Sequence, residues 1–270
     1  MKVSKRSRLV WVLGLFLLTA GCTQVAITGR RQLNIVPDSM MDAMSYDAYN
    51  EFITQNKLST NTGQQQMVKG VGGRISKAVQ QYCVEHGLGD RVKDYQWEFN
   101  LVEDASVNAW AMPGGKVVVY TGLMSVAGDE AGLAVVMGHE IAHVIARHGA
   151  ERMSLGLVKE FGGIALSKAI ATRPAATREL FMRSYGTGTQ LGVLLPYSRL
   201  HESEADEMGL IFMAMAGYHP SEAVVFWQRM SAAQSGPATV EILSTHPADA
   251  TRIRNIKRLV PKAMQYYRPQ

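Results

Sequence analysis

Residues 136–144, V-M-G-H-E-I-A-H-V, constrain the fold of this chain more than any other segment, because they place two histidines one helical turn apart. On a helix, His139 and His143 project from one face, close enough for both imidazoles to hold one metal ion. Glu140 is placed to polarise a water at that metal. The apolar neighbours indicate a buried helix rather than two surface histidines. His148 is turned away from the metal-binding face and is expected to be solvated or to pack in the protein.

A catalytic zinc needs three protein ligands and one open position. Residues 198–206, S-R-L-H-E-S-E-A-D, supply the candidates on a second predicted helix. Glu202 and Asp206 are four residues apart, so Glu202 can be a ligand while Asp206, one turn on, accepts the free N–H of a metal-bound histidine. His201 is a rival ligand, but its spacing to Asp206 argues against it. Glu204 is expected to be a solvated acid.

Helical spacing of apolar residues predicts helices over residues 37–54 and 66–86, the first capped by Asp38 or Ser39. From Asp129, which is placed to cap the metal-binding helix, helical periodicity dominates to the end of the chain. The sequence shows no internal repeat and no long linker. It therefore predicts one α+β domain.

Strand signals are confined to a short central region. Residues 97–101 alternate apolar and polar side chains, as a half-buried strand does. Residues 107–112 and 116–120 are two β-prone runs on either side of a Pro-Gly-Gly turn, which predicts a hairpin.

The N-terminus has the layout of a secretion signal. Residues 1–8 carry four positive charges, and residues 9–20 form an apolar run too short to span a bilayer comfortably. The run ends in L-T-A-G-C, which resembles a bacterial lipobox and predicts that Cys22 is lipidated and becomes the first mature residue. Thr19 departs from the pattern, and an ordinary signal or an N-terminal anchor helix is the alternative. Thr23 after the cysteine is typical of lipoproteins sent to the outer membrane.

Composition excludes several classes of protein. A hydrophobic content of 47% with 19% charged residues is inconsistent with disorder or a multi-span membrane protein. The formal net charge of +5 depends largely on residues 1–8, so the rest of the chain is nearly neutral and is a poor nucleic-acid binder. Two cysteines cannot make a disulfide framework, and Cys83 is expected to be a buried thiol.

The paired motifs resemble one family. H-E-x-x-H followed about sixty residues later by S-R-x-x-E-x-x-A-D is similar to the zinc metallopeptidases related to HtpX and the type 1 CAAX prenyl protease. With T-G-R-R-Q-L at residues 28–33, the chain resembles bacterial lipoprotein relatives of the mitochondrial Oma-type protease. The similarity runs from about residue 65 to 259. It implies one Zn²⁺ per chain with the following site residues: ligands His139, His143 and Glu202, catalytic base Glu140, and supporting carboxylate Asp206.

The resemblance extends to residues 108–115, N-A-W-A-M-P-G-G, which match the family's N-A-x-A-x-P-G-G stretch. It implies that this edge strand binds an extended substrate backbone by β-addition. The implied substrate-binding residues are Asn108, Ala109, Trp110 and Ala111.

T-H-P at residues 245–247, with Arg252 six residues after the histidine, matches a further family segment. The resemblance implies that His246 lies near the zinc, either as a transition-state donor or as a ligand that closes the site. From the residues alone, a helix-capping histidine before a Pro-started helix is the alternative. Arg252 is expected to support the oxyanion, or else to be a solvated arginine beside Arg254.

Together these features predict an α+β fold, a mostly helical zincin domain of the gluzincin type, with a small antiparallel sheet whose edge strand flanks the active-site cleft. Residues 1–21 are expected to be a lipoprotein signal, 22–64 a tether and helix, and 65–270 the peptidase domain. The expected location is the bacterial outer membrane, with the protein held through lipidated Cys22 and facing the periplasm.

The predicted function is zinc-dependent hydrolysis of peptide bonds in unfolded or misassembled envelope proteins, with Glu140 as general base. The expected partners are polypeptides and the membrane, without nucleic acid. One alternative is an assembly or quality-control binding factor with a mostly closed zinc site and little proteolysis. The other is a structural lipoprotein with a fortuitous motif, which would not retain stoichiometric zinc.

Overall fold

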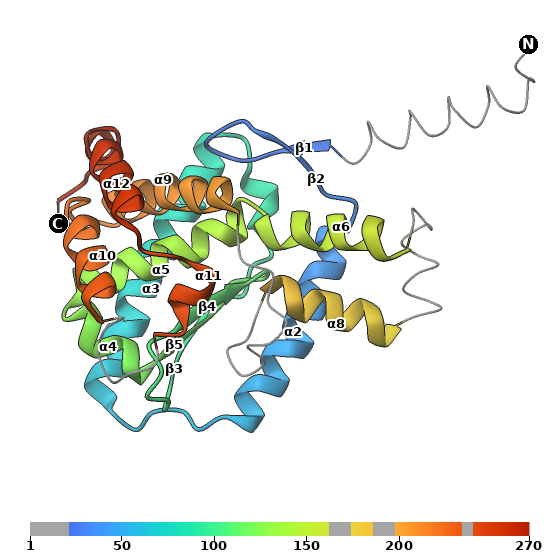
Figure 1. The fold of residues 1–270 in the computed structure, drawn as a ribbon, viewed down its shortest axis with the longest axis horizontal. Coiled ribbons are helices and arrows are strands. Elements are labelled where there is room, and N and C mark those ends of the chain that lie inside the picture. Colours follow the sequence, from blue (N-terminus) through green and yellow to red (C-terminus); the bar gives the residue numbers. More distant parts are fainter. Residues whose placement is uncertain (1–21, 162–173, 186–197, 234–239, 270) are drawn as a thin grey trace, which may run out of the picture.

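A computed structural model describes residues 22–161, 174–185, 198–233 and 240–269 (Figure 1). The expected signal, residues 1–21, lies outside the described residues. In chain order the described elements are β1 (Cys22–Gln24), β2 (Arg31–Leu33), α2 (Asp38–Gln55), α3 (Thr62–Glu85), η1 (Gly89–Arg91), β3 (Glu98–Val102), β4 (Ala109–Met112), β5 (Lys116–Tyr120), α4 (Thr121–Ala127), α5 (Glu130–Ile145), α6 (His148–Phe161), α8 (Pro174–Tyr185), α9 (Arg199–Met215), α10 (Glu222–Ala233), α11 (Ile242–Thr245), α12 (Ala250–Ala263) and η2 (Met264–Tyr266).

The central sheet has three strands in the order β3-β5-β4. β4 and β5 form the expected antiparallel hairpin, with Trp110 opposite Val118. The sheet is mixed rather than purely antiparallel, because β3 pairs with β5 in parallel. After β3 the chain crosses to the far position to form β4, and the hairpin returns β5 between the two. Gly114 and Gly115 have φ of 79° and 85°, the left-handed conformation that the tight turn requires. β4 is therefore an edge strand, as expected.

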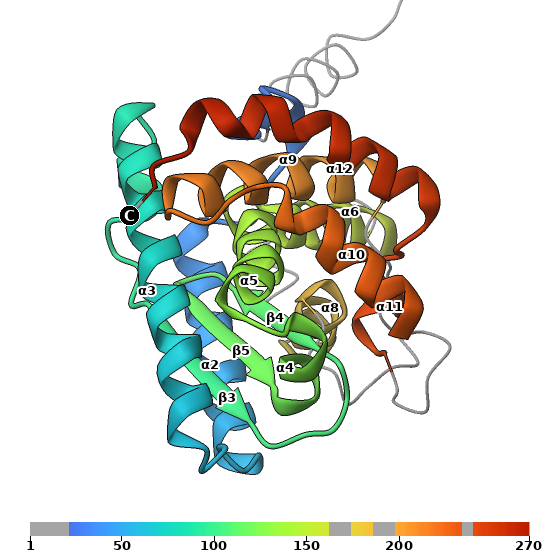
Figure 2. The same cartoon turned by 90° about the vertical axis from the view of Figure 1, so that its left-hand side faces the viewer.

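The sheet is covered on both faces. Because strand side chains alternate, Val117 and Val119 belong to the apolar cluster formed with α3, α5 and α9, while Val118, Tyr120 and Trp110 belong to the cluster formed with α2, α6 and α8. Figure 2 shows α5 between the sheet and α9, with α12 outside α9. The α+β, mostly helical prediction is confirmed, and the metal-binding helix lies in the middle layer.

Helix boundaries follow the sequence closely. α2 begins at Asp38, but Pro37 holds the cap position and no side chain caps the helix. α3 begins at Thr62, earlier than expected, because the Asn61 side chain accepts a hydrogen bond from the backbone N–H of Gln64. Cys83 is a buried free thiol, as expected.

The residues before α2 form a β1–β2 hairpin, which sequence analysis did not predict. The hairpin packs along α6: the backbone N–H of Ile35 donates to Ser154 Oγ at 3.1 Å. In the part of the chain that the structure describes, none of the helices combines the length and the apolar character that crossing a bilayer requires.

Candidate metal centre

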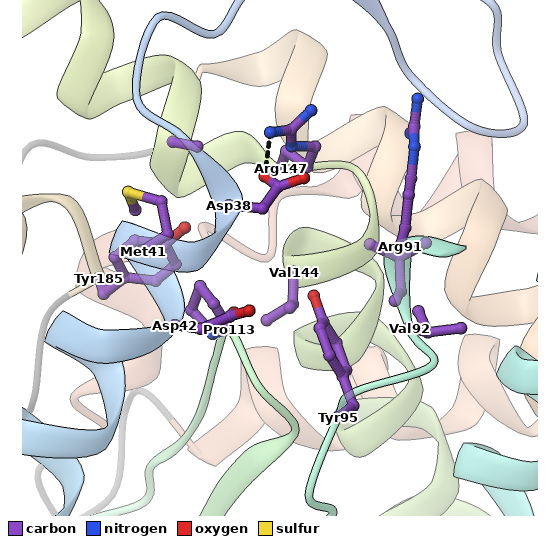
Figure 3. A pocket seen from close by; sticks show the side chains of 12 residues that line it. Asp38, Met41, Asp42, Arg91, Val92, Tyr95, Pro113, Val144, Arg147 and Tyr185 are labelled. Atoms are coloured by element: carbon purple, nitrogen blue, oxygen red, sulfur yellow. Dashed lines mark hydrogen bonds and ion pairs between the residues drawn. The ribbon is translucent and has the colours of Figure 1, made fainter. Parts of the chain in front are cut away.

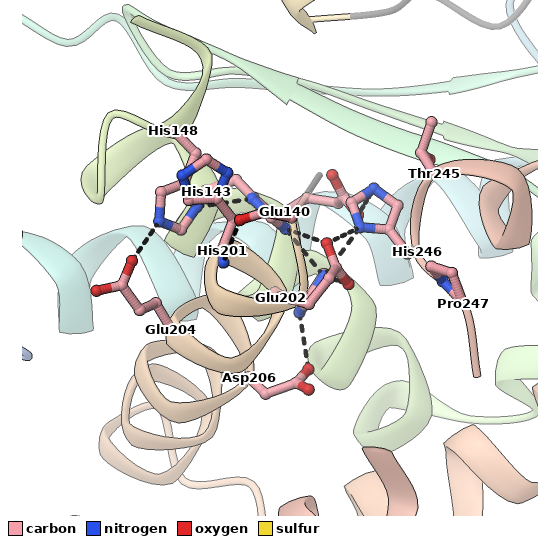
Figure 4. A network of polar contacts seen from close by, with 12 residues as sticks. Glu140, His143, His148, His201, Glu202, Glu204, Asp206, Thr245, His246 and Pro247 are labelled. Atoms are coloured by element: carbon pink, nitrogen blue, oxygen red, sulfur yellow. Dashed lines mark hydrogen bonds and ion pairs between the residues drawn. The ribbon is translucent and has the colours of Figure 1, made fainter. Parts of the chain in front are cut away.

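Helix α5 presents the first two candidate ligands from the protein interior. Figure 4 shows one of them, His143, beside Glu202 of α9. Asp129 caps the helix as expected, accepting a hydrogen bond from the backbone N–H of Gly132 at 2.8 Å. His139 and His143 are 2% and 3% exposed, and their Nε2 atoms lie 3.1 Å apart. Two ligands of a tetrahedral zinc are separated by about 3.3 Å. The pair therefore has the spacing that one zinc ion needs.

Helix α9 supplies the third candidate ligand. Glu202 Oε1 lies 3.3 Å from His143 Nε2, and Oε2 lies 3.5 Å from His139 Nε2. α9 and α5 cross where Gly138 faces Gly209. A Cβ on Gly138 would lie 3.0 Å from the Gly209 carbonyl oxygen, and one on Gly209 would lie 2.9 Å from the His139 nitrogen. The helices are thus packed backbone against backbone beside the ligands.

His246 lies directly after α11 and completes the cluster. Its Nδ1 is 2.8 Å from Glu202 Oε1 and 3.2 Å from His139 Nε2. Helix α12 begins at Ala250, and Asp249 caps it by accepting from the Arg252 backbone N–H at 2.8 Å. The helix start is therefore served by Asp249 rather than by His246. One ligand atom from each of His139, His143, Glu202 and His246 lies within 4.8 Å of the others, so the four could hold a metal ion.

The charges of the site fit a divalent cation. The buried carboxylates are those of Glu140, Glu202 and Asp206, and the buried guanidinium is that of Arg252. With the imidazoles neutral, as metal ligands must be, two negative charges are therefore in excess among the described residues of the site, which one Zn²⁺ would balance. Among the described atoms, buried Glu140 Oε1 also has no hydrogen-bond partner, and burial raises the pKa of this carboxyl. The donor set of three imidazoles and one carboxylate is typical of zinc.

The His139 side is supported by a buried ion pair. Asp206 Oδ1 lies 3.0 Å from His139 Nδ1, as the sequence predicts for a supporting carboxylate. Arg252 donates to both oxygens of Asp206, at 2.8 and 2.9 Å, and its Nη1 lies 3.0 Å from Glu202 Oε2. The guanidinium also lies 3.6 Å above the Trp227 ring. Arg252 is thus buried, not solvated. Its guanidinium donors face Asp206, which contacts His139, and Glu202, which is itself a candidate ligand.

On the His143 side the expectation for Glu204 is wrong. Glu204 is 3% exposed and accepts hydrogen bonds from Arg30. His148 is fully buried, with its Nδ1 2.9 Å from His143 Nδ1. His201 lies away from the ligand cluster: it pairs with Glu151 and stacks on His148. Sequence reasoning missed Arg30, although it lies in the T-G-R-R-Q-L segment that carried part of the resemblance.

β4 lies against α5 with its expected substrate-binding residues buried. Asn108 Oδ1 accepts from the Ala109 backbone N–H at 2.9 Å, and its Nδ2 donates to Glu241 at 3.1 Å. Its carbonyl accepts from the Tyr120 N–H at 3.0 Å. Because antiparallel pairing alternates, Ala109 and Ala111 direct their backbone groups away from β5. Trp110 packs on the opposite face, its ring 5.0 Å from that of Phe52.

A second charged cluster lies at the C-terminal end of α5, around a cavity of about 30 Å³ (Figure 3). Arg147 has φ of 61°, unusual for a residue other than glycine, and forms an ion pair with Asp38. Burial, followed by the charges of Asp38 and Asp94, raises the pKa of Asp42 to about 6. Within the described ranges, this cluster does not group the donor atoms that a metal would need.

Comparison with known proteins agrees with this geometry. The profile of peptidase family M48 matches residues 73–260. The chain belongs to peptidase family M48. It is a zinc metalloendopeptidase, and both the resemblance and the zinc cofactor predicted from sequence are confirmed.

The relatives of this M48 chain include mitochondrial proteins. It is 31% identical to the mitochondrial metalloendopeptidase OMA1 of Schizosaccharomyces pombe, over 95% of this chain and 73% of that protein. It is also 31% identical to OMA1 of Saccharomyces cerevisiae, over 98% and 70%. The beta-barrel assembly-enhancing protease of Escherichia coli matches at 31% identity over 60% of this chain and 34% of that protein.

These comparisons contradict the expected location. The two OMA1 proteins match nearly the whole chain and are mitochondrial by name, whereas the Escherichia coli protein matches a smaller share. The prediction of a bacterial outer-membrane lipoprotein facing the periplasm is therefore wrong. Lipidation of Cys22 stays a prediction, since the structure describes the residue only as the first of β1.

Proposed function

We propose that this M48 peptidase hydrolyses peptide bonds in extended, unfolded polypeptides, with Glu140 as the general base. The observation that carries the proposal is the position of Glu140 between the two histidines of α5, where its buried Oε1 has no hydrogen-bond partner among the described atoms. A zinc site with a purely structural role needs no such carboxylate. Zinc, when bound by His139, His143 and Glu202, supplies a Lewis acid that polarises the scissile carbonyl and activates water.

Glu140 moves the proton in this mechanism. Its carboxylate takes a proton from the attacking water as the new C–O bond forms, and delivers it to the amide nitrogen as the C–N bond breaks. Burial raises the pKa of Glu140, which favours proton uptake. Asp206 and Arg252 hold His139 in one orientation while this happens. No covalent link between enzyme and substrate is needed.

The edge of β4 supports an extended substrate. The outward carbonyl of Ala109 and the outward backbone groups of Ala111 can pair with a peptide strand laid alongside, which recognises backbone rather than sequence, while the Ala109 N–H is held by Asn108. Such recognition needs a segment free of its own secondary structure. This is why we propose unfolded chains as substrates.

The position of His246 supports a second candidate function, a metal site that is closed to water and substrate at rest. As a fourth donor, His246 would complete the coordination of a metal and leave no open position, as in structural zinc sites. We propose that His246 is a gate: it occupies this position at rest and moves away when substrate pairs with β4. In its present position the Nε2 of His246 lies 3.6 Å from Glu140 Oε1, which also places this histidine near the general base for a role as transition-state donor.

The test of the general base is Glu140→Gln. The amide cannot accept the proton, so cleavage of unfolded casein should disappear while one zinc per chain is retained, measured by metal analysis. Glu207→Ala is the control, because Glu207 is half-buried on α9 and pairs with Lys262 instead of the candidate ligands. Near wild-type cleavage by Glu140→Gln would refute the proposal.

His246→Ala separates the roles of the histidine. A gate predicts faster basal cleavage, whereas loss of a transition-state donor predicts a decrease of about 10²–10³-fold. Exposed His219→Ala should change neither rate nor zinc content. Unchanged cleavage by His246→Ala would contradict both roles.

We also propose that Cys22 carries a lipid, on the support of the apolar run and small residues before it. No compartment is part of this proposal. Intact mass spectrometry of wild type and Cys22→Ser tests it, since the acyl mass should disappear in the variant.

A further inference from the structure

We propose that Arg30 is a positioning residue for the zinc ligand His143. It joins the carboxylates of Glu204 and Glu151, and these hold the two histidines, His148 and His201, that lie behind the ligand. The inference rests on the zinc ligands of the proposed function and extends the site to the N-terminal hairpin, about 170 residues away in sequence from Glu204.

The first step is the contact between His143 and His148. Their Nδ1 atoms lie 2.9 Å apart, and His148 Nε2 lies 3.1 Å from Glu204 Oε2. A carboxylate only accepts, so His148 donates from Nε2, and the Nδ1 of the neutral ring must accept. His143 therefore donates from Nδ1, which leaves its Nε2 lone pair for the metal. The position of Glu204 thus selects the tautomer of His143 that can bind zinc.

The second step is the position of Glu204 itself. Arg30 Nε donates to both of its carboxylate oxygens at 3.0 Å, and Thr28 Oγ1 donates to Oε1 at 2.6 Å. The side chain of Glu204 is only 4% exposed. A buried carboxylate without these donors would move toward water or leave its charge unpaired. Arg30 and Thr28 therefore keep Glu204 in place as the acceptor for His148.

The third step is the link to Glu151. The two terminal nitrogens of Arg30 donate to its two carboxylate oxygens at 2.9 and 2.7 Å, a bidentate pair. Glu151 Oε2 lies 3.0 Å from His201 Nε2, and the His201 ring stacks on His148 at 4.4 Å. The Arg30 guanidinium thus holds His148 in two ways. It positions Glu204, which accepts a hydrogen bond from the His148 ring, and Glu151, which holds His201 stacked on the face of that ring. Only the planar fork of arginine can serve two carboxylates in this way.

The β1–β2 hairpin that carries Arg30 is itself held on the helices of the site. Gly29 has φ of 67° in the turn, and Gln32 Nε2 donates to the carbonyl of Ala146, at the end of α5, at 2.9 Å. Arg31 is exposed, whereas its neighbours Arg30 and Gln32 point inward. Arg31 therefore offers a matched control of the same residue type in the same segment.

The experiment is a competition titration of the full chain with Zn²⁺ against a chelator of known affinity. Loss of a residue that orients a metal ligand typically weakens metal binding about 10–100-fold, and this is the effect expected for Arg30→Ala. Arg31→Ala should match wild type. Arg30→Ala binding zinc within about threefold of wild type would overturn the proposal. A wild-type chain that binds no zinc would instead refute the proposed zinc site.

A second variant and a second readout separate positioning from folding. Arg30→Lys keeps the charge but cannot bridge two carboxylates, so it should remain more than about threefold weaker than wild type for zinc, and full recovery would overturn the role of the fork. It carries the test alone if Arg30→Ala does not fold. Absorption of the Co²⁺-loaded variants should differ from wild type, and kcat should fall with KM unchanged. An unaltered Co²⁺ spectrum in Arg30→Lys would likewise contradict the proposal.

Discussion

The two histidines of α5 have different supports. His139 contacts a charged group directly, Asp206, which is paired with Arg252 from α12. At Nδ1, the side away from the ligand cluster, His143 contacts a neutral ring, His148, and the charges on that side lie one step further away. The support of His139 comes from the C-terminal half of the chain, whereas that of His143 includes the N-terminal hairpin.

The difference appears in the proton affinities of the two imidazoles. Burial and Arg252 lower the pKa of His139, but hydrogen bonds with Asp206 and Glu202 outweigh them and raise it to about 9. Burial lowers the pKa of His143 well below its usual value. In the metal-free site, one helix therefore carries an imidazole with a raised pKa and an imidazole with a lowered pKa. The additional contact with Asp206 raises the basicity of His139, while the relay through His148 selects the tautomer of His143.

The largest effect on stability is expected from breaking the charged support. Asp206→Ala leaves Arg252 buried without its main partner, which should lower the free energy of unfolding by about 3–5 kcal/mol. Chemical unfolding of the zinc-free protein measures the change. Glu207→Ala removes only a surface pair with Lys262 and should cost less than about 1 kcal/mol. Equal losses in the two variants would contradict the comparison.

A smaller effect is expected on the other side. Glu204→Ala removes the acceptor of His148, but Arg30 keeps its pair with Glu151, so the loss should be about 1–3 kcal/mol. Ser203→Ala, at the exposed neighbouring position, is the control in the same unfolding experiment. A loss larger than that of Asp206→Ala would reverse the ranking of the two supports.

Acid should act on the His143 side through Glu151. Burial opposes its ionisation, but hydrogen bonds from Arg30 and His201 lower its pKa from 4.5 to about 2. A lowered pKa contributes stability above pH 4.5 that is lost as the pH falls toward 2. Unfolding of the chelator-treated protein between pH 5 and 2 measures this loss, and the slope should flatten in Arg30→Met. The same slope in both proteins would exclude the Arg30–Glu151 pair as its source.

The smallest effect concerns the charged cluster at the C-terminal end of α5, which lies apart from the candidate metal ligands. The raised pKa of Asp42, about 6, means that its contribution to stability is present below pH 3.8 and is lost as the pH rises through 6. Asp42→Asn should therefore raise the thermal midpoint at pH 8 by on the order of 1–2 °C and leave it unchanged at pH 3.5. Asp47→Asn, exposed on the same helix, is the control. A lowered midpoint at pH 8 would contradict the assignment.

Local spacing was sufficient to find three of the four candidate ligands and the hairpin, whereas His246 was indicated only by the family resemblance. His139 and His143, like Glu202 and Asp206, are one turn apart, and the Pro-Gly-Gly turn fixes β4 against β5. The parallel pairing of β3 with β5 could not be predicted in the same way. β5 comes later in the chain than β4 and yet lies between β3 and β4, and no local sequence pattern indicates that arrangement. Glu204 is two residues after Glu202, which turns it toward the opposite face of α9. That face is buried against His148 of α6 and against Arg30 and Thr28 of the N-terminal hairpin, and sequence spacing within α9 cannot reveal such contacts.

The contact of Gly138 with Gly209 has a consequence for the choice of ion. The direct backbone contact between the two glycines sets the distance between α5 and α9. This distance in turn sets how close the imidazoles of α5 lie to the Glu202 carboxylate of α9. A single methyl group at either glycine would force the helices apart and enlarge the hollow between the donor atoms. Two residues without a side chain therefore set the spacing between the donor atoms of the two helices, on which the choice of ion depends.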